Sequence, residues 1–176
     1  FEKVGFPAIS KTIRMGYDGK GQARVGEPRD ISEAWAQIGR LPSIAEAMIQ
    51  FDAEFSVILT RATNGDIRFW DSPRNRHEGG ILARSTLPAG PLIEDQQAEA
   101  RKLAAAAADE LEYVGVMTME FFATANGPLF NEMAPRVHNS GHWTIEGAAT
   151  SQFENHIRAV CDLPLGATDL MVDRVE

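Results

Sequence analysis

A short segment in the last third of the sequence carries carboxylate, amide, guanidinium and imidazole side chains in close succession. Residues 131–142 contain Glu132, Arg136, His138 and His142, and they follow a hydrophobic run. Side chains of these kinds hold divalent cations, bind phosphates and carboxylates, and move protons. The occurrence of so many of these side chains within one short segment indicates a functional site. A solvated loop would not explain it easily.

A second acidic residue lies just upstream of this segment. Residues 116–122 alternate in polarity and predict a strand that carries Glu120, and Asn126-Gly127 is a strong hairpin signal. A two-residue loop at Asn126-Gly127 would put Glu120 and Glu132 on opposite faces. A three-residue loop ending in a left-handed Gly127 would set them directly opposite each other, with Cβ atoms about 5 Å apart. Facing carboxylates suit Mg²⁺, so this register predicts a metal and phosphate site; the alternative is two carboxylates at the rim of an exposed hairpin.

A glycine-rich stretch near the start of the chain is a second candidate for phosphate binding. Gly16, Gly19 and Gly21 are flanked by Lys11 and Lys20, so backbone N–H groups and positive charge could both meet a polyphosphate. The stretch has no Lys-Ser/Thr pair and no helix start after it, which disfavours a Walker A loop. By itself the same pattern is also typical of a structural turn.

The elements that must position these residues are mixed helices and strands. Strands are predicted on both sides of the glycine-rich stretch, and residues 43–49, 54–60 and 66–70 are predicted to form an antiparallel meander. His77 falls in a predicted polar loop. A lobe boundary is predicted near residues 46–51.

Three helices are predicted from capping signals and apolar spacing. One begins at Asp30 with a capping box to Glu33 and places Trp35 in the core. A long alanine-rich helix covers residues 93–112, with an apolar side that includes Leu103 and Leu111. The last begins at Ser151 and is expected to face inward with these residues: Phe153, Ile157, Val160 and Cys161.

Composition limits the classes of function. The chain has 176 residues, 44% of them hydrophobic, and a formal net charge of -8, which argues against a general nucleic-acid or membrane surface. The single cysteine, Cys161, excludes an intrachain disulfide, so a cytoplasmic location is the simplest interpretation. No membrane span or signal sequence is recognised in the sequence.

Taken together, the motifs resemble the ATP-grasp family of 5-(carboxyamino)imidazole ribonucleotide synthases. The resemblance rests on Glu120, on residues 131–144 and on Thr150-Ser151-Gln152-Phe153-Glu154, and it extends through Gly5-Phe6-Pro7, residues 16–22 and residues 163–166. It implies an α+β ATP-grasp fold: two α+β lobes with antiparallel sheets, with nucleotide held between them. Residues 1–50 would form the small lobe, and residues 51–176 the large lobe with the metal and substrate site. Because the family has further segments on both sides, the chain is interpreted as an internal fragment.

The resemblance also implies roles for individual residues. Lys11 and Arg136 would be catalytic, Glu120 and Glu132 would bind Mg²⁺, and Arg136 with His138 would bind the substrate. Residues 46–49 would take the adenine through backbone groups, and Glu54 the ribose hydroxyls. The proline after Trp70 comes later than is usual in the family, which leaves the reach of His77 open. The implied ATP-binding residues are Lys11, Gly16, Tyr17, Asp18, Gly19, Lys20, Gly21, Gln22, Glu46, Ala47, Met48, Ile49, Glu54, His77, Asn131 and Glu132.

The reaction implied by the resemblance is the ATP-dependent carboxylation of 5-aminoimidazole ribonucleotide with bicarbonate, with ATP and Mg²⁺ as cofactors. A homodimer is expected from the same source, with no nucleic-acid or membrane partner. Ala134 stands where biotin carboxylase-type motifs have Asn, which favours the purine enzyme. The alternatives are another ATP-grasp carboxylase, a formate-dependent purine enzyme, and a nucleotide-binding module without turnover.

Overall fold

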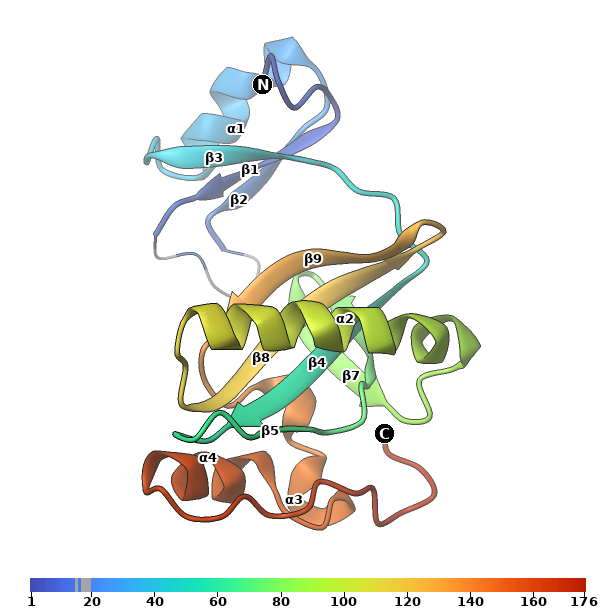
Figure 1. The fold of residues 1–176 in the computed structure, drawn as a ribbon. Coiled ribbons are helices and arrows are strands. Elements are labelled where there is room, and N and C mark those ends of the chain that lie inside the picture. The colour runs from blue at the N-terminus through green and yellow to red at the C-terminus, as the bar shows by residue number, and fades with distance from the viewer. Residues whose placement is uncertain (15, 17–19) are drawn as a thin grey trace. The chain divides into compact units, whose positions relative to one another are not determined.

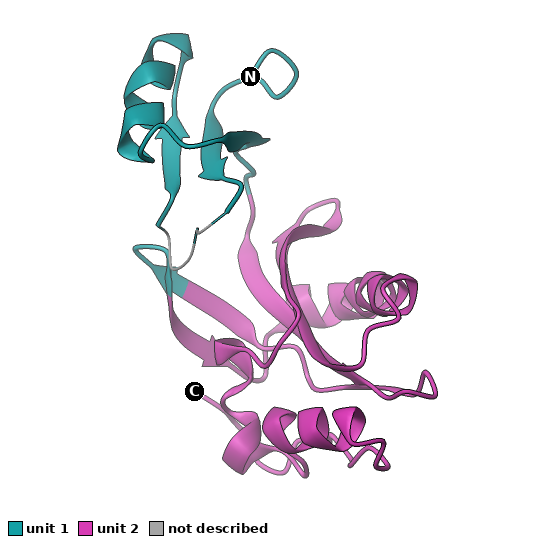
Figure 2. Cartoon of the chain, turned by 90° about the vertical axis from the view of Figure 1, so that its left-hand side faces the viewer, with its two compact units in different colours: residues 1–50, 77–81 teal, residues 51–76, 82–176 magenta. Residues whose placement is uncertain are grey.

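The computed structural model of the protein describes residues 1–14, 16 and 20–176. This part of the chain forms two compact units (Figure 2). One unit consists of residues 1–50 with 77–81, and the other of residues 51–76 with 82–176. The predicted boundary at residue 50 did not anticipate that residues 77–81 would group with the first unit. Both units combine antiparallel sheets with helices, so the α+β fold class is confirmed.

The first unit is a three-stranded antiparallel sheet in the order β2-β1-β3, with one helix beside it (Figure 1). Its small core consists of Ala23 and Val25 from β2, packed against Ala34 and Ile38. The predicted strands on either side of the glycine-rich stretch are therefore confirmed. The elements are β1 (Ala8–Thr12), β2 (Gln22–Val25), the 3-10 helix η1 (Pro28–Asp30), α1 (Ile31–Gln37) and β3 (Ser43–Ala47).

Helix α1 differs from its prediction in two details. Trp35, expected in the core, is 47% exposed, and its Nε1 donates a hydrogen bond to the backbone oxygen of Leu41 at 3.0 Å. The helix rests on a small sheet, so only a narrow stripe of it is buried. The carboxylate of Asp30 accepts hydrogen bonds from the backbone N–H groups of Gly26 and Glu27 at 3.1 and 3.0 Å, one turn before the predicted capping box.

The second unit is built on a six-stranded sheet in the order β7-β6-β4-β8-β9, with β5 paired to β4. The predicted meander is wrong in its first strand, because β3 pairs with β1 in the first unit. Apolar periodicity indicates strands but not their partners. The predicted loop around His77 is also wrong, since this residue lies in a strand. The strands are β4 (Ala53–Arg61), β5 (Ile67–Phe69), β6 (Arg74–Glu78), β7 (Ile81–Thr86), β8 (Gly115–Thr124) and β9 (Gly127–Ala134).

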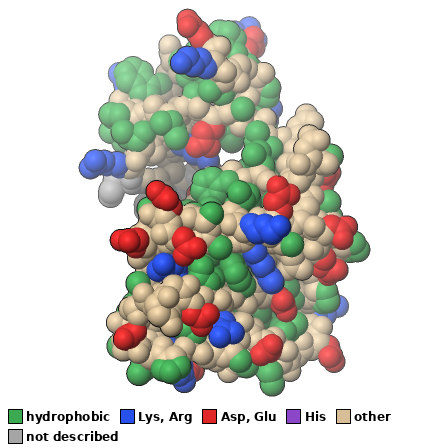
Figure 3. Space-filling model, viewed as in Figure 1, with side chains coloured by type: hydrophobic (Ala, Val, Ile, Leu, Met, Phe, Trp, Pro, Cys, Tyr) green, Lys and Arg blue, Asp and Glu red, His purple; other side chains and the backbone are tan. Residues whose placement is uncertain are grey.

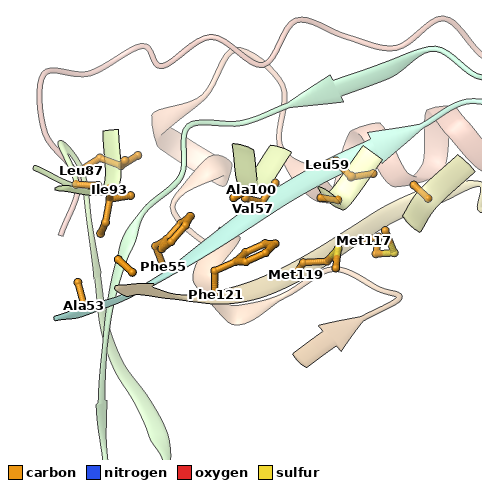
Figure 4. Packing of buried hydrophobic residues seen from close by; sticks show 14 residues of the cluster. Ala53, Phe55, Val57, Leu59, Leu87, Ile93, Ala100, Met117, Met119 and Phe121 are labelled. Carbon is orange, nitrogen blue, oxygen red and sulfur yellow. The ribbon is translucent and has the colours of Figure 1, made fainter. Parts of the chain in front are cut away.

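Helix α2 (Pro91–Glu110) covers one face of this sheet. Its buried residues include Ala100, Ala104 and Ala108, whose small side chains let the helix approach the strands closely. Beneath it, Phe55 and Phe121 stack with ring centroids 5.5 Å apart within the main core (Figure 4). The predicted helix is confirmed, but its predicted apolar side is wrong.

The alanines take the buried stripe of α2, so the larger leucines point outward. Leu103 and Leu111 are 45% and 56% exposed. On the face of the molecule that carries α2, acidic and basic side chains are interspersed (Figure 3).

Helix α4 (Gln152–Val160) packs on β8 and β4, on the opposite face from α2. Its predicted start is confirmed, because the Ser151 hydroxyl oxygen accepts a hydrogen bond from the Glu154 N–H at 3.1 Å. The predicted inward face is wrong. Polar Gln152 and Asn155, together with Ala159, are the buried residues. The residues expected inside are exposed instead: Phe153, Ile157, Val160 and Cys161.

Two short helices precede α4 and connect it to β9. They are η2 (Asn139–Gly141) and α3 (Thr144–Gly147). Within the part of the chain that the structure describes, no helix combines the length and the apolar character needed to cross a membrane.

Candidate active site

Glu120 of β8 and Glu132 of β9 lie directly opposite each other. The predicted register is confirmed, but neither loop considered from the sequence produces it. Thr124 pairs with Gly127, so the turn is shorter and consists of Ala125 and Asn126. A β-bulge then restores the pairing, because Phe121 pairs with Phe130 and Glu120 with Glu132. Asn131 is the extra residue of the bulge; if the pairing on the tip side continued without a bulge, Glu120 would face Asn131 and not Glu132.

Glu120 is a buried carboxylate, only 8% exposed. It lies between Ser56 on β4 and Glu132 on β9, on the sheet face opposite the Phe121 side chain. A buried charged group needs compensating polar contacts. The imidazole of His138 supplies one, with Nε2 3.3 Å from Oε1 of Glu120.

The His138 ring is also held at its other nitrogen. Nδ1 lies 2.8 Å from the Ser140 hydroxyl oxygen and accepts a hydrogen bond from the Ser140 backbone N–H at 3.3 Å. A backbone N–H can only donate, so the neutral ring carries its proton on Nε2, the nitrogen that faces Glu120. The structure thus places His138 against the carboxylate; its role toward substrate phosphate stays a prediction.

The two carboxylates fit a magnesium ion that is shared with a substrate. Mg²⁺ is typically bound by one or two carboxylates together with substrate phosphates and waters. Among the described residues, no group of three or more His, Cys, Asp or Glu side chains could hold a metal ion by itself. Thr118, two residues before Glu120 on the same face, has a buried hydroxyl without a partner in the described structure. These oxygen ligands do not form a closed protein cage. They suit a cation that binds together with substrate phosphates.

In the first unit, the lysine predicted to bind phosphate forms an ion pair with another residue predicted to bind ATP. Lys11 Nζ lies 2.6 Å from Oε2 of Glu46, and both side chains are partly exposed. The two residues belong to neighbouring strands, β1 and β3. A surface pair of this kind contributes little to stability, about 0 to 1 kcal/mol. A competing anion could therefore displace Glu46 from Lys11 at little cost.

The glycine-rich stretch is described only in part. Gly16, Lys20, Gly21 and Gln22 are described, and Gln22 begins β2 opposite Lys11. Gly21 has a φ of +74°, and a Cβ at this position would lie 2.5 Å from the Thr12 hydroxyl oxygen, so only glycine fits. Tyr17, Asp18 and Gly19 lie outside the described residues.

The predicted adenine segment begins within β3 and continues beyond it. Glu46 and Ala47 pair with Ile9 and Ala8 of β1. The Met48 N–H donates to the Pro7 oxygen at 3.1 Å, and Ile49 follows outside the strand. The structure thus fixes the start of this segment on the sheet of the first unit.

Two further predicted nucleotide residues lie on strands of the larger sheet. Glu54 of β4 pairs with Asn75 of β6 and Phe122 of β8, on the same sheet face as Glu120. His77 is half-buried in β6. Their roles toward nucleotide stay predictions.

Arg136 does not lie on the strand that carries Glu132. Strand β9 ends at Ala134, and Arg136 lies exposed in the connection to η2. Its guanidinium donates to the Val137 oxygen at 2.9 Å. Pro135 at the end of the strand explains the break, because proline cannot donate to the ladder. The substrate role of Arg136 therefore stays a prediction from the resemblance.

Sequence reasoning did not identify Gln152, the fully buried residue that binds the backbone of His138. Its Nε2 donates to the His138 oxygen at 2.7 Å, and its Oε1 accepts from the His138 N–H at 2.9 Å. Gln152 stands at the start of an amphipathic helix, where its polarity gave no sign of burial. The aromatic pair of Phe51 and Phe122, with ring centroids 4.3 Å apart, was also not identified.

Comparison with known proteins defines the class. A model of the ATP-grasp domain matches residues 1–153, and the chain belongs to the ATP-grasp family. The facing carboxylates on neighbouring antiparallel strands and the lysine-bearing sheet are thus parts of an ATP-grasp domain.

Within that family, the chain is similar to proteins of one name. The chain is 48% identical over 165 residues to the N5-carboxyaminoimidazole ribonucleotide synthase of Pseudomonas aeruginosa, covering 94% of this chain and 45% of that protein. The structure of the corresponding synthetase from Thermus thermophilus matches with a TM-score of 0.87 at 48% identity, over 96% of this chain and 45% of that one.

A third relative was solved with ligands. The synthase from Aspergillus clavatus, in complex with ADP and 5-aminoimidazole ribonucleotide, matches with a TM-score of 0.86 at 32% identity, over 95% of this chain and 43% of that one. The chain spans less than half the length of each of these three relatives.

Proposed function

We propose that this chain is the nucleotide-binding and metal-binding part of an ATP-dependent ligase. The reaction is the carboxylation of 5-aminoimidazole ribonucleotide with bicarbonate, giving N5-carboxyaminoimidazole ribonucleotide, ADP and phosphate. The observation that carries the proposal is the Glu120 and Glu132 register, with His138 against Glu120, in a chain similar to synthases of this name.

The first step is phosphoryl transfer to bicarbonate. A bicarbonate oxygen attacks the γ-phosphorus of ATP, the bond from phosphorus to the β,γ-bridging oxygen breaks, and ADP leaves as carboxyphosphate forms. Such transfers depend on positioning and charge stabilisation more than on covalent catalysis. Lys11 would supply positive charge to the phosphates, and Glu120 and Glu132 would hold Mg²⁺. When bound, Mg²⁺ would supply positive charge that balances the charge developing on the phosphate oxygens.

The second step joins carbon to nitrogen. The amine of the ribonucleotide attacks the carboxyl carbon of carboxyphosphate, the bond to the phosphate oxygen breaks, and inorganic phosphate leaves while the amine loses a proton. Arg136 is exposed, and its planar guanidinium suits the carboxylate or phosphate of these anions. His138 would share the substrate phosphate with Arg136.

The test measures ADP formation by the full-length protein with Mg-ATP, 5-aminoimidazole ribonucleotide and either bicarbonate or formate. ADP formation that requires bicarbonate, with one carboxylated ribonucleotide formed per ADP, is the expected result. Dependence on formate would assign the chain to the formate-using relative. Nucleotide binding without turnover would indicate a non-catalytic module and overturn the proposal.

A further inference from the structure

The buried side-chain amide of Gln152 forms two hydrogen bonds with the backbone of one residue of the site, His138. Gln152 is 0% exposed, and its amide oxygen and nitrogen bind the N–H and the oxygen of His138. This pairing imitates the contact between adjacent strands, in a segment where β9 has already ended. It satisfies a buried amide that would otherwise be costly to leave without partners.

The surrounding residues leave this amide little freedom. The Gln152 N–H donates to the Thr144 hydroxyl oxygen at 3.0 Å, and that hydroxyl donates to the Gly141 oxygen at 2.7 Å. A Cβ on Gly141 would lie 2.7 Å from the Gln152 side-chain carbonyl group, so glycine provides the space for the amide. The first residue of α4 and the turn after His138 therefore form one polar cluster.

We propose that Gln152 is a positioning residue, which acts through His138 to fix the Glu120 carboxylate for the Mg-nucleotide. Gln152 fixes the His138 backbone, Ser140 fixes Nδ1 of the ring, and Nε2 then faces Oε1 of Glu120. Residues that orient a metal-binding group from behind typically affect metal affinity or activity 10- to 100-fold. This inference rests on the proposed metal role of Glu120.

The same helix provides a matched control. Asn155 is also 0% exposed, and its amide binds the Gly166 backbone in the same manner, with bonds of 3.2 and 2.8 Å. Gln152→Met and Asn155→Leu each remove one buried amide with two hydrogen bonds. A general loss of stability would affect both variants, whereas a positioning role is specific to Gln152.

The experiment uses the full-length protein and two readouts that do not require turnover. The first is the ¹⁵N NMR signal of the His138 ring without nucleotide, assigned by its loss in His138→Ala. The second is Mg²⁺ affinity in the presence of ADP, measured by calorimetry. We expect Gln152→Met to lose the Nε2-protonated ring signature and to weaken Mg²⁺ binding about tenfold or more. Asn155→Leu should leave the ring signal unchanged and alter Mg²⁺ affinity less than about twofold.

Two further variants keep the test decisive. Gly141→Ala displaces the amide without removing it and should reproduce the change in the ring signal if Gln152→Met folds poorly. In a His138→Ala background, Gln152→Met should weaken Mg²⁺ binding no further, because the residue through which it acts is absent. An unchanged ring signal in both Gln152→Met and Gly141→Ala would overturn the inference. So would an effect of Gln152→Met on Mg²⁺ binding that persists without His138. Failure of bicarbonate dependence alone would instead contradict the proposed reaction.

Discussion

At the scale of single residues, the two carboxylates of the site face each other across neighbouring strands but have different surroundings. Glu120 is buried and contacts His138, whereas Glu132 is exposed at the edge of the sheet. Exposed side chains away from packing contacts usually contribute within about 0.5 kcal/mol to stability. Glu132 can therefore be tested for function with little effect on folding.

Glu132→Gln is predicted to lower Mg²⁺-dependent ADP formation about a hundredfold or more, because a neutral amide is a poor ligand for a hard cation. The free energy of unfolding should stay within about 0.5 kcal/mol of the unmodified protein. Steady-state kinetics across a Mg²⁺ titration and urea denaturation measure the two effects. Glu110→Gln, an exposed change at the end of α2, is the control. Near-normal turnover of the Glu132 variant would contradict the metal assignment.

Tyr113 gives a prediction about alkaline pH. Its hydroxyl donates to the Val116 oxygen at 2.9 Å, and burial raises the pKa of this group above its ordinary value of 10.0. The native state then keeps a proton that the unfolded chain releases. The contribution of the protonated Tyr113 hydroxyl to the stability of the native state is therefore complete below about pH 10, and it is lost as the pH rises through the raised pKa. Tyr113→Phe should show a smaller fall in unfolding free energy between about pH 9 and pH 11. An equal fall in both proteins would contradict this.

At the scale of elements, burial on α2 is decided by how closely the helix must approach β4 and β8. Ala104 is 0% exposed, while its neighbour Leu103 is 45% exposed. Overpacking a well-packed core typically costs about 1 to 3 kcal/mol. The two adjacent positions should therefore respond in opposite ways to a change of size.

Ala104→Leu is predicted to lower the free energy of unfolding by about 2 kcal/mol, because the larger side chain would press on the sheet. Leu103→Ala on the same helix should change it by less than about 1 kcal/mol, because the removed atoms are largely exposed. Urea denaturation of both variants measures the difference. A larger cost at Leu103 than at Ala104 would show that the leucine side of α2 is the packed side.

The same elements show what could be predicted from the sequence. Helix starts, the Glu120 strand and the hairpin follow from local signals such as Ser151 and the apolar alternation of β8. The inward sides of α2 and α4 could not be predicted, because they depend on tertiary spacing and on partners for buried amides. In α4, Gln152 and Asn155 are buried because two backbone segments need their hydrogen bonds. The bulge at Asn131 has no signal in local composition.

At the scale of the whole molecule, the two units have separate hydrophobic cores. Val25 belongs to the core of the first unit, and Phe55 and Phe121 belong to that of the second. Units with separate cores often open independently, with different free energies. Local destabilisation of one unit should then leave the other protected.

Val25→Ala is predicted to accelerate amide hydrogen exchange in β1 and β2 while β4 and β8 keep their protection. Val25 is 0% exposed, and the small core around it has few other large side chains to compensate. Hydrogen exchange measured by mass spectrometry resolves the two regions. Equal acceleration in β8 would show that the two cores unfold as one cooperative unit.

The extra residue in β9 has a consequence for how this hairpin tolerates changes in length. The pairing on the tip side is set by the short turn, and the pairing of the carboxylates is offset from it by one position. Removing Asn131 would merge the two halves into one regular ladder and still leave Glu132 across from Glu120. Related sequences that are one residue shorter at this point can therefore retain the same acidic pair, so alignments should permit a gap there without discarding the site.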